Sequence, residues 1–234
     1  MSTYGWVDLF SVLFPFLFSF HPRLRFYKQW PAFFPAVFGM MGLFVPWDAL
    51  FTHAGIWGFN PEHVCGFYEF GLPIEEWLFF ICVPYACVFT YHCFGVLGVK
   101  DRIGKHARTI SIALIIALLV MGASHWELAY TSTTFILLAC MLSFVTFVMK
   151  ATWMARFFFS YIVLLLPFLV VNGVLTGTGL GTPVVWYDNS ENLGVRILTI
   201  PVEDIFYGML MLLLTVTLYE AILSRRSPAR IRGN

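Results

Sequence analysis

The chain has 234 residues, of which 59% are hydrophobic, 19% aromatic and 12% charged. Soluble domains carry about 25% charged residues, and a chain this apolar cannot cover a water-facing surface with polar groups. The composition excludes a soluble globular enzyme, a disordered protein and a nucleic-acid-binding protein, while the formal net charge of +1 indicates no particular partner. We therefore expect an integral membrane protein with almost no extramembranous domain.

Apolar stretches of the length of a membrane helix recur along the chain. Such a helix needs about 20 mostly apolar residues. The first stretch is short and contains Asp8, but it has no Lys or Arg before Arg23 and so lacks the basic start of a cleaved signal peptide. The sequence thus predicts an all-α polytopic protein with seven transmembrane helices, at 4–20, 31–52, 74–96, 109–125, 128–149, 157–175 and 202–223.

With seven transmembrane helices, nearly all basic residues fall on the same side of the membrane. Of the 14 Lys and Arg residues, all except Arg196 fall on one side of the membrane. By the positive-inside rule that side is cytoplasmic, which predicts an inner or plasma membrane protein with an external N-terminus and a cytoplasmic C-terminus. Acidic residues show the reverse distribution, and only Asp101 and Glu220 map to the cytoplasmic side.

An internal repeat joins the two longest outer segments. One series is Trp57, Asn60, Glu62, Gly66 and Pro73-Ile74-Glu75-Glu76, and the other is Trp186, Asn189, Glu191, Gly194 and Pro201-Val202-Glu203-Asp204. The offset is 129 residues as far as Glu62 and 128 from Gly66 onward. Each series lies in an outer loop and runs into a helix, so the two units are expected to have the same orientation, as parallel repeats do.

The repeat predicts how the chain is divided. We expect a first three-helix unit at 1–96, a connector containing the fourth helix at 97–127, and a second three-helix unit at 128–224. A basic cytoplasmic tail at 225–234 would follow.

Two acidic pairs begin the third and seventh predicted helices. Proline followed by acids is a common helix start, because the acids face the positive end of the helix, and duplication alone could repeat it. However, carboxyl groups close to hydrocarbon are costly and are usually functional. Two close carboxyls can also hold different protonation states, which suits proton transfer to and from an apolar substrate. The candidate catalytic residues are Glu75, Glu76, Glu203 and Asp204, with Asp48 as a helper.

Aromatic and polar residues flank these acids. An interfacial aromatic belt is one interpretation, and a π-lined pocket that stabilises a cation is the other. Asn60, Asn189 and Arg196 could simply fix the loops by hydrogen bonding. The candidate substrate-binding residues are Trp47, Trp57, Phe59, Asn60, Trp77, Trp186, Asn189, Arg196 and Tyr207.

Other functional motifs fail in this sequence. The alternating glycines Gly177, Gly179 and Gly181 follow a membrane helix rather than a strand, so they are no dinucleotide fingerprint. No histidine pair has metal-ligand spacing, and the five cysteines show no zinc or redox spacing. No predicted helix interior carries a lysine that could form a retinal Schiff base. We therefore expect neither a cofactor nor a metal.

These residues resemble the integral-membrane lycopene cyclases, which occur as two small subunits, as one fused chain or as a domain of fungal bifunctional carotenoid enzymes. The matching stretches are Trp47-Asp48, 55–61, Pro73-Ile74-Glu75-Glu76, 194–196, 199–204 and Tyr207-Gly208. The resemblance covers nearly the whole chain. It implies a lycopene β-cyclase that needs no nucleotide cofactor, takes its substrate from the lipid bilayer and associates with other carotenoid enzymes.

The chemistry of the acids agrees with this resemblance. An acyclic polyene end can be cyclised without redox change when an acid protonates its terminal double bond and a base later removes a ring proton. We expect one composite site that uses acids of both repeats, rather than one site in each repeat. The alternative function is a non-catalytic seven-helix receptor or transporter that binds a carotenoid or another lipid, with the carboxyls as polar ligands or a proton relay.

Overall fold

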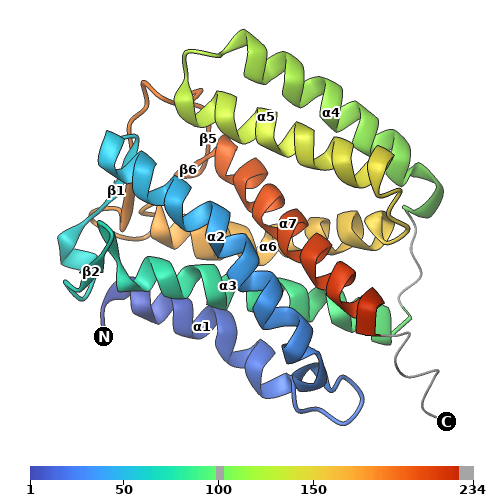
Figure 1. The fold of residues 1–234 in the computed structure, drawn as a ribbon. Coiled ribbons are helices and arrows are strands. Elements are labelled where there is room, and N and C mark those ends of the chain that lie inside the picture. The colour runs from blue at the N-terminus through green and yellow to red at the C-terminus, as the bar shows by residue number, and fades with distance from the viewer. Residues whose placement is uncertain (99–102, 227–234) are drawn as a thin grey trace, which may run out of the picture.

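The computed structural model describes residues 1–98 and 103–226, and it is almost entirely helical (Figure 1). Parts of the predicted connector and of the predicted basic tail, including Lys100, Arg102, Arg230 and Arg232, lie outside these ranges. The helices are α1 (Thr3–Phe18), α2 (Trp30–Ala54), α3 (Ile74–Val96), α4 (Ala107–Ser124), α5 (Ala129–Ser143), α6 (Met154–Leu175) and α7 (Val202–Arg226). The prediction of an all-helical architecture is confirmed, with helix ends within a few residues of the expected ones.

Six helical segments in the described ranges, α2 to α7, are long and apolar enough to cross a membrane; α5 reaches this length because a π-helical turn, Phe144–Val148, continues it to a span of 20 residues. Helix α1 has 16 residues, a length of about 24 Å against a hydrocarbon core of about 30 Å. Its outward side is apolar, with Phe10, Phe14 and Leu17 all exposed. The membrane character is thus confirmed for six helices, and the crossing of α1 stays a prediction.

Local sequence signals explain where the helices begin and end. The Ser2 hydroxyl accepts a hydrogen bond from the Gly5 amide at 3.1 Å and so caps α1. Helix α2 ends at Gly55, whose φ of 77° is the left-handed conformation that glycine adopts at helix ends. Helices α3 and α7 each begin directly after a proline, with two acids in the first turn. Those acids face the positive end of the helix dipole.

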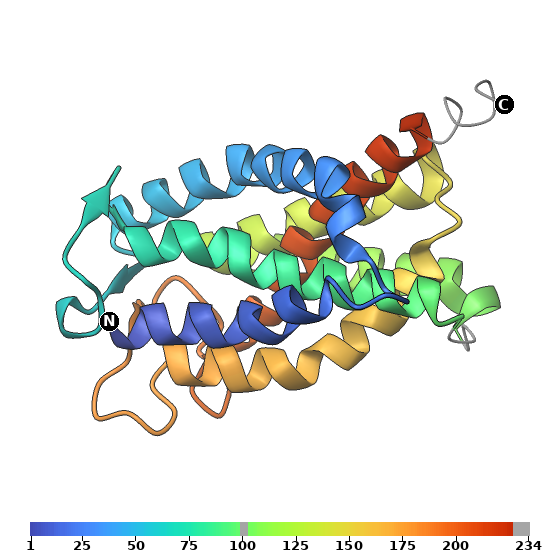
Figure 2. The ribbon, with the colours of Figure 1, turned by 90° about the horizontal axis from the view of Figure 1, so that it is seen from below.

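The helices form one bundle in which neighbours in space are often distant in sequence. Helix α1 packs on α3, α5 packs on α7, and α2 crosses α7 (Figure 1). Helix α4 packs against α5 at one edge of the bundle. The view from below shows α1 and α6 side by side, and α3 packs against both (Figure 2). The central core lies where α2, α3, α6 and α7 meet, as shown by the full burial of Phe33, Phe80, Phe157 and Leu213.

Six short strands at one end of the bundle are a feature that the sequence did not predict. They are β1 (Trp57–Phe59), β2 (Tyr68–Glu69), β3 (Leu72–Pro73), β4 (Val185–Tyr187), β5 (Arg196–Ile197) and β6 (Ile200–Pro201). Strand β1 pairs antiparallel with β4, and Gly58 lies opposite Trp186. Hairpins β2–β3 and β5–β6 lead into α3 and α7. Runs of two or three residues carry too little periodicity to be recognised as strands in a sequence.

The two hairpins share two backbone features at an offset of 128 residues. Phe70 and Leu198 both have a left-handed backbone, with φ of 53° and 57°. In the first hairpin the Ile74 amide donates to the Phe67 carbonyl at 3.0 Å, and in the second the Val202 amide donates to the Val195 carbonyl at 3.0 Å. Because a non-glycine residue rarely has positive φ, the shared conformation supports the offset read from the sequence.

A charged cluster lies at the opposite end of the bundle from the strands. Arg156 on α6 forms an ion pair with Glu220 on α7, and its guanidinium lies 4.0 Å from the centre of the Tyr91 ring. The Tyr91 hydroxyl also donates to Glu220 at 2.6 Å. Glu220 is one of the two acids that the sequence placed on the cytoplasmic side, and its position is explained by this pairing with Arg156.

Candidate active site

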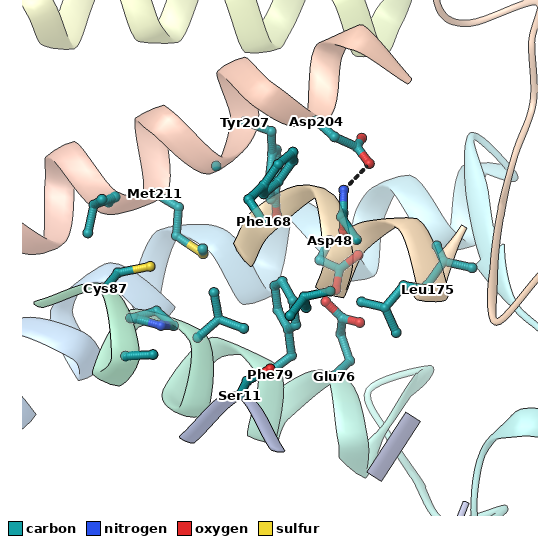
Figure 3. Close-up of a pocket in the computed structure, with 18 of the residues that line it drawn as sticks. Ser11, Asp48, Glu76, Phe79, Cys87, Phe168, Leu175, Asp204, Tyr207 and Met211 are labelled. Carbon is teal, nitrogen blue, oxygen red and sulfur yellow. Dashed lines mark hydrogen bonds between the residues drawn. The ribbon is translucent and has the colours of Figure 1, made fainter. Parts of the chain in front are cut away.

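A cavity of about 170 Å³ lies inside the bundle, mainly between α3, α6 and α7. It is elongated: Asp48, Glu76 and Asp204 lie towards one end, and Cys87 and Met211 line the other (Figure 3). Strands β1 and β4 close the carboxyl end, where they contribute Trp57, Phe59, Val185 and Tyr187. The rest of the lining is almost entirely apolar, so three carboxyl groups face a space that is otherwise suited to a hydrocarbon.

Glu76 and Asp48 form a pair of facing carboxyl groups (Figure 3). Glu76 comes from the first turn of α3 and Asp48 from α2, and both side chains line the cavity. The Tyr4 hydroxyl donates to Glu76, and the Trp57 indole N–H donates to Asp48 Oδ1 at 2.5 Å. Both acids are at least 93% buried. Two facing carboxylates that are both buried repel each other unless a proton is held between them, so this pair is a proton-holding site.

Asp204 approaches the same cavity from α7 and has a different set of partners. Tyr130 donates to Oδ1 at 2.5 Å, while the Asn172 amide and the Tyr187 hydroxyl donate to Oδ2 at 2.7 and 3.0 Å. Figure 3 marks the bond from Asn172. Three neutral donors on one carboxylate stabilise its charged form.

Tyr187 lies on β4 in the segment between α6 and α7, and its phenol holds its proton firmly. Burial raises the pKa of Tyr187 well above its ordinary value, and the negative charge of Asp204 raises it further. Tyr187 is therefore a hydrogen-bond donor to Asp204 at any pH near neutrality.

Glu75 and Glu203 do not line the cavity. Glu75 Oε1 accepts hydrogen bonds from the Ser2 hydroxyl at 2.5 Å and the Cys65 amide at 2.7 Å. Glu203 Oε1 accepts from the Thr131 hydroxyl at 2.6 Å and the Leu193 amide at 2.8 Å. Both carboxyls thus join a loop to the first helix of their unit. Cys65 and Leu193 are 128 residues apart, so this contact is also shared by the two units.

Of the candidate aromatic residues, some line the cavity and others lie outside it. Trp57, Phe59 and Tyr207 line the cavity. Trp47 lies behind Tyr207, with its ring centre 5.2 Å from that of Tyr207. Trp186 is 43% exposed and covers Gly58 from outside, so closely that a Cβ on Gly58 would lie 2.4 Å from its ring. Trp77 is also remote from the cavity, because its indole N–H donates to the Glu69 carbonyl at 3.4 Å.

Asn60, Asn189 and Arg196 hold loops together and do not reach the cavity. Asn60 Oδ1 accepts from the Glu62 amide at 3.0 Å. Arg196 donates to Asn189 Oδ1 at 2.7 Å and to the Thr199 carbonyl at 2.6 Å. This arrangement matches the loop-fixing interpretation of these three residues.

Four residues that donate hydrogen bonds to the cavity acids were not among the predicted site residues: Tyr4, Tyr130, Asn172 and Tyr187. Tyr4 and Tyr130 each lie near the start of the first helix of a unit and donate to the cavity acid of the same unit. Their offset of 126 residues differs from that of the acids, which hid the correspondence. Asn172 was detectable as a polar residue near the end of an apolar helix, a position that is costly without a partner.

Taken together, the fold and the cavity define a helical membrane protein with an internal apolar cavity that three carboxyl groups face. Within the described residues there is no group of three or more His, Cys, Asp and Glu side chains that could hold a metal ion. The arrangement can donate and accept protons away from water, beside aromatic rings whose faces stabilise positive charge.

Comparison with known families shows to which family the chain belongs. The family model described as lycopene cyclase matches residues 1–94 and 127–222, which is most of the chain. The chain belongs to the lycopene cyclase family, as the resemblance implied. Comparisons with curated proteins and with solved structures find no match.

Proposed function

We propose that this chain is a lycopene β-cyclase, which converts the acyclic ends of lycopene into β-rings and so makes β-carotene by way of γ-carotene. The observation that carries the proposal is the meeting of Glu76, Asp48 and Asp204 in one apolar cavity. The acids come from helices of both predicted repeats, which supports a single composite site.

The size of the cavity supports this reaction. Cavities of about 150 Å³ lined by apolar side chains admit a ring the size of benzene, and this cavity has about 170 Å³. It therefore suits one end group of the substrate, while the rest of the polyene must lie outside. Ser11 on α1 and Phe168 on α6 are partly exposed members of the lining, so we place the entry from the bilayer between these two helices.

The reaction needs only proton transfers. A carboxylic acid protonates the terminal carbon–carbon double bond, and the carbocation is attacked by a neighbouring double bond, which closes a six-membered ring. A carboxylate then removes a ring proton and restores a double bond. One proton enters and one leaves, so the reaction is an isomerisation. The rings of Trp57, Phe59 and Tyr207 face the cavity and would stabilise the carbocation.

Pigment analysis tests the proposal. Expression in a bacterium that accumulates lycopene is expected to replace the red acyclic pigment with yellow cyclic carotenoids, and chromatography of the extract identifies the ring type. A variant with Asp48→Asn, Glu76→Gln and Asp204→Asn is the matched control and should leave lycopene unchanged. If the unaltered chain inserts into the membrane but leaves lycopene unchanged, the non-catalytic carotenoid-binding function is favoured instead.

The seven-span arrangement belongs to the same proposal. The two ranges matched by the family model correspond to α1–α3 and α5–α7, and α4 lies between them as the connector. With α1 as a span, the N-terminus is external and the basic end of the bundle is cytoplasmic.

Reporter experiments test this topology. Reporters fused after Arg108 and after Asn234 should read cytoplasmic, and a tag placed before Met1 should be accessible on intact cells. A cytoplasmic tag at the N-terminus would exclude the crossing of α1, and an external reading at either fusion would exclude the whole arrangement.

A further inference from the structure

The two carboxyl groups contributed by α3 and α7 have unlike surroundings. Asp204 accepts three hydrogen bonds, from Tyr130, Asn172 and Tyr187, none of which is itself an acid. Its negative charge is therefore well satisfied without any added proton. Protonating Asp204 would remove an acceptor position that one of these donors now uses, so the surroundings favour the carboxylate.

Glu76 has another carboxyl as its neighbour. Asp48 Oδ2 is buried and receives no hydrogen bond from an N–H or O–H group of the described residues. It belongs to a side chain that faces Glu76 in the cavity (Figure 3). Two negative carboxylates in contact inside an apolar cavity repel each other strongly, so the pair must retain a proton. Glu76 and Asp204 therefore differ in protonation because their partners differ. Helix α2 places a carboxyl group beside Glu76, whereas α6 places an amide beside Asp204.

We infer that the Asp48–Glu76 pair donates the proton that starts the cyclisation and that Asp204 accepts the proton that ends it. This assignment of roles rests on the proposed function. In each turnover the pair starts with both carboxyl groups protonated; one proton leaves and forms a C–H bond at the terminal double bond, and the other stays shared between the two carboxyls. One ring C–H bond breaks, and its proton goes to Asp204. The substrate neither gains nor loses electrons, and transfer of the proton from Asp204 back to the pair after product release resets the site.

The two roles match the acid strength needed for the first proton transfer and the base strength needed for the last. Protonation of a carbon–carbon double bond needs an acid whose conjugate base is stabilised, and the negative charge left on the pair is shared with the Trp57 N–H and the Tyr4 hydroxyl. A carbocation loses a proton readily, so a weakly basic carboxylate is sufficient for the last step.

Solvent deuterium separates the two roles. Membranes or purified protein are incubated with lycopene in D₂O, and both the products and the recovered substrate are examined by mass spectrometry. Because the acid exchanges its proton with solvent, the unaltered chain should place one deuterium in each ring. Glu76→Gln should reduce deuterium uptake by about 10²–10⁴-fold, the usual cost of losing a general acid. Asp48→Asn should also reduce it, because an amide would then stabilise Glu76 as a carboxylate.

Asp204→Asn should behave differently from both. The carbocation still forms but lacks its base, so deuterium should appear in recovered substrate or in a product captured by water, while ring formation falls. Asp204→Glu, which keeps a carboxylate, should restore part of the ring formation. If Asp204→Asn does not accumulate, Tyr187→Phe combined with Asn172→Ala is used instead and should likewise keep deuterium uptake while ring formation falls.

A control variant and two contrary outcomes complete this experiment. Glu62→Gln alters an exposed carboxyl of the outer loop and should leave both deuterium uptake and ring formation unchanged. Deuterium uptake that survives Glu76→Gln, or that is lost in Asp204→Asn protein inserted at normal yield, would overturn the assignment of roles. Failure of the unaltered chain to form rings would instead overturn the proposed function.

Discussion

Glu76→Gln and Asp204→Asn are each expected to abolish the formation of both rings of the product, not of one. The two acids come from different three-helix units but line one cavity, so both ends of the substrate must use the same pair of roles. Loss of a general acid or base costs about 10²–10⁴ in rate. Chromatography of carotenoids from cells expressing each variant measures the ratio of acyclic, monocyclic and bicyclic pigment, and residual pigment should be acyclic.

Membrane insertion must be normal in both variants for this result to count. Their yield in the membrane fraction is compared with that of Glu62→Gln, which changes the same kind of group outside the cavity. If Glu76→Gln accumulates monocyclic pigment at the normal rate, each three-helix unit serves one end of the substrate and the composite site is wrong. If both variants keep full activity, the acids serve only the helix starts.

Filling the cavity is the second change with a large expected effect. Gly208 on α7 lines the cavity, and a Cβ added there would lie 3.5 Å from the Phe168 ring and 3.9 Å from the Tyr161 hydroxyl. Gly208→Phe would place a ring in the space that we assign to the end group of lycopene. We expect cyclisation to fall by at least about 10²-fold, because displacement of a substrate by about an ångström already costs that much. Initial rates with lycopene in liposomes measure the effect.

Gly208→Ala is the matched control for this change. Its methyl group makes ordinary van der Waals contacts in the structure, and alanine is favoured over glycine inside a helix by about 1 kcal/mol. This variant should therefore retain activity and unfold at an equal or higher temperature. Full activity of Gly208→Phe would show that the reacting end group lies elsewhere.

The helices were predictable because each depends on a local property of its sequence. A run of about 20 apolar residues has few other stable states in a membrane, and a proline followed by two acids marks the starts of α3 and α7. Helix α1 is the least certain for the same reason, since its 16 residues give a weak signal. The packing of α1 on α3 and of α5 on α7 depends on contacts between distant segments, which only the repeat indicated.

The sequence was sufficient to predict that the two acidic pairs belong to the site, but not which acid of each pair lines the cavity. Neighbouring residues on a helix point about 100° apart, so only one acid of each pair faces the cavity. The sequence does not show which helices pack together, and it therefore does not show which of the two acids faces inward. The structure places Glu76 and Asp204 there and leaves Glu75 and Glu203 with loop amides.

Trp186 illustrates a different difficulty. The sequence aligned it with Trp57, but β1 and β4 pair so that Gly58 lies opposite Trp186. Successive residues of a strand point to opposite faces, and a shift of one position therefore sends a side chain to the other side. Trp57 faces the cavity while Trp186 lies outside it. Tyr187, the next residue, has the inward position and donates to Asp204.

The pairing of β1 with β4 also bears on how such a protein could be assembled from separate pieces. Each strand belongs to a different three-helix unit, and each uses the other to satisfy its backbone N–H and C=O groups. A unit made alone would present an open strand edge beside an unfinished, carboxyl-lined hollow at the membrane surface. Such an edge recruits a partner strand, so the ladder that closes the cavity would also select the complementary half.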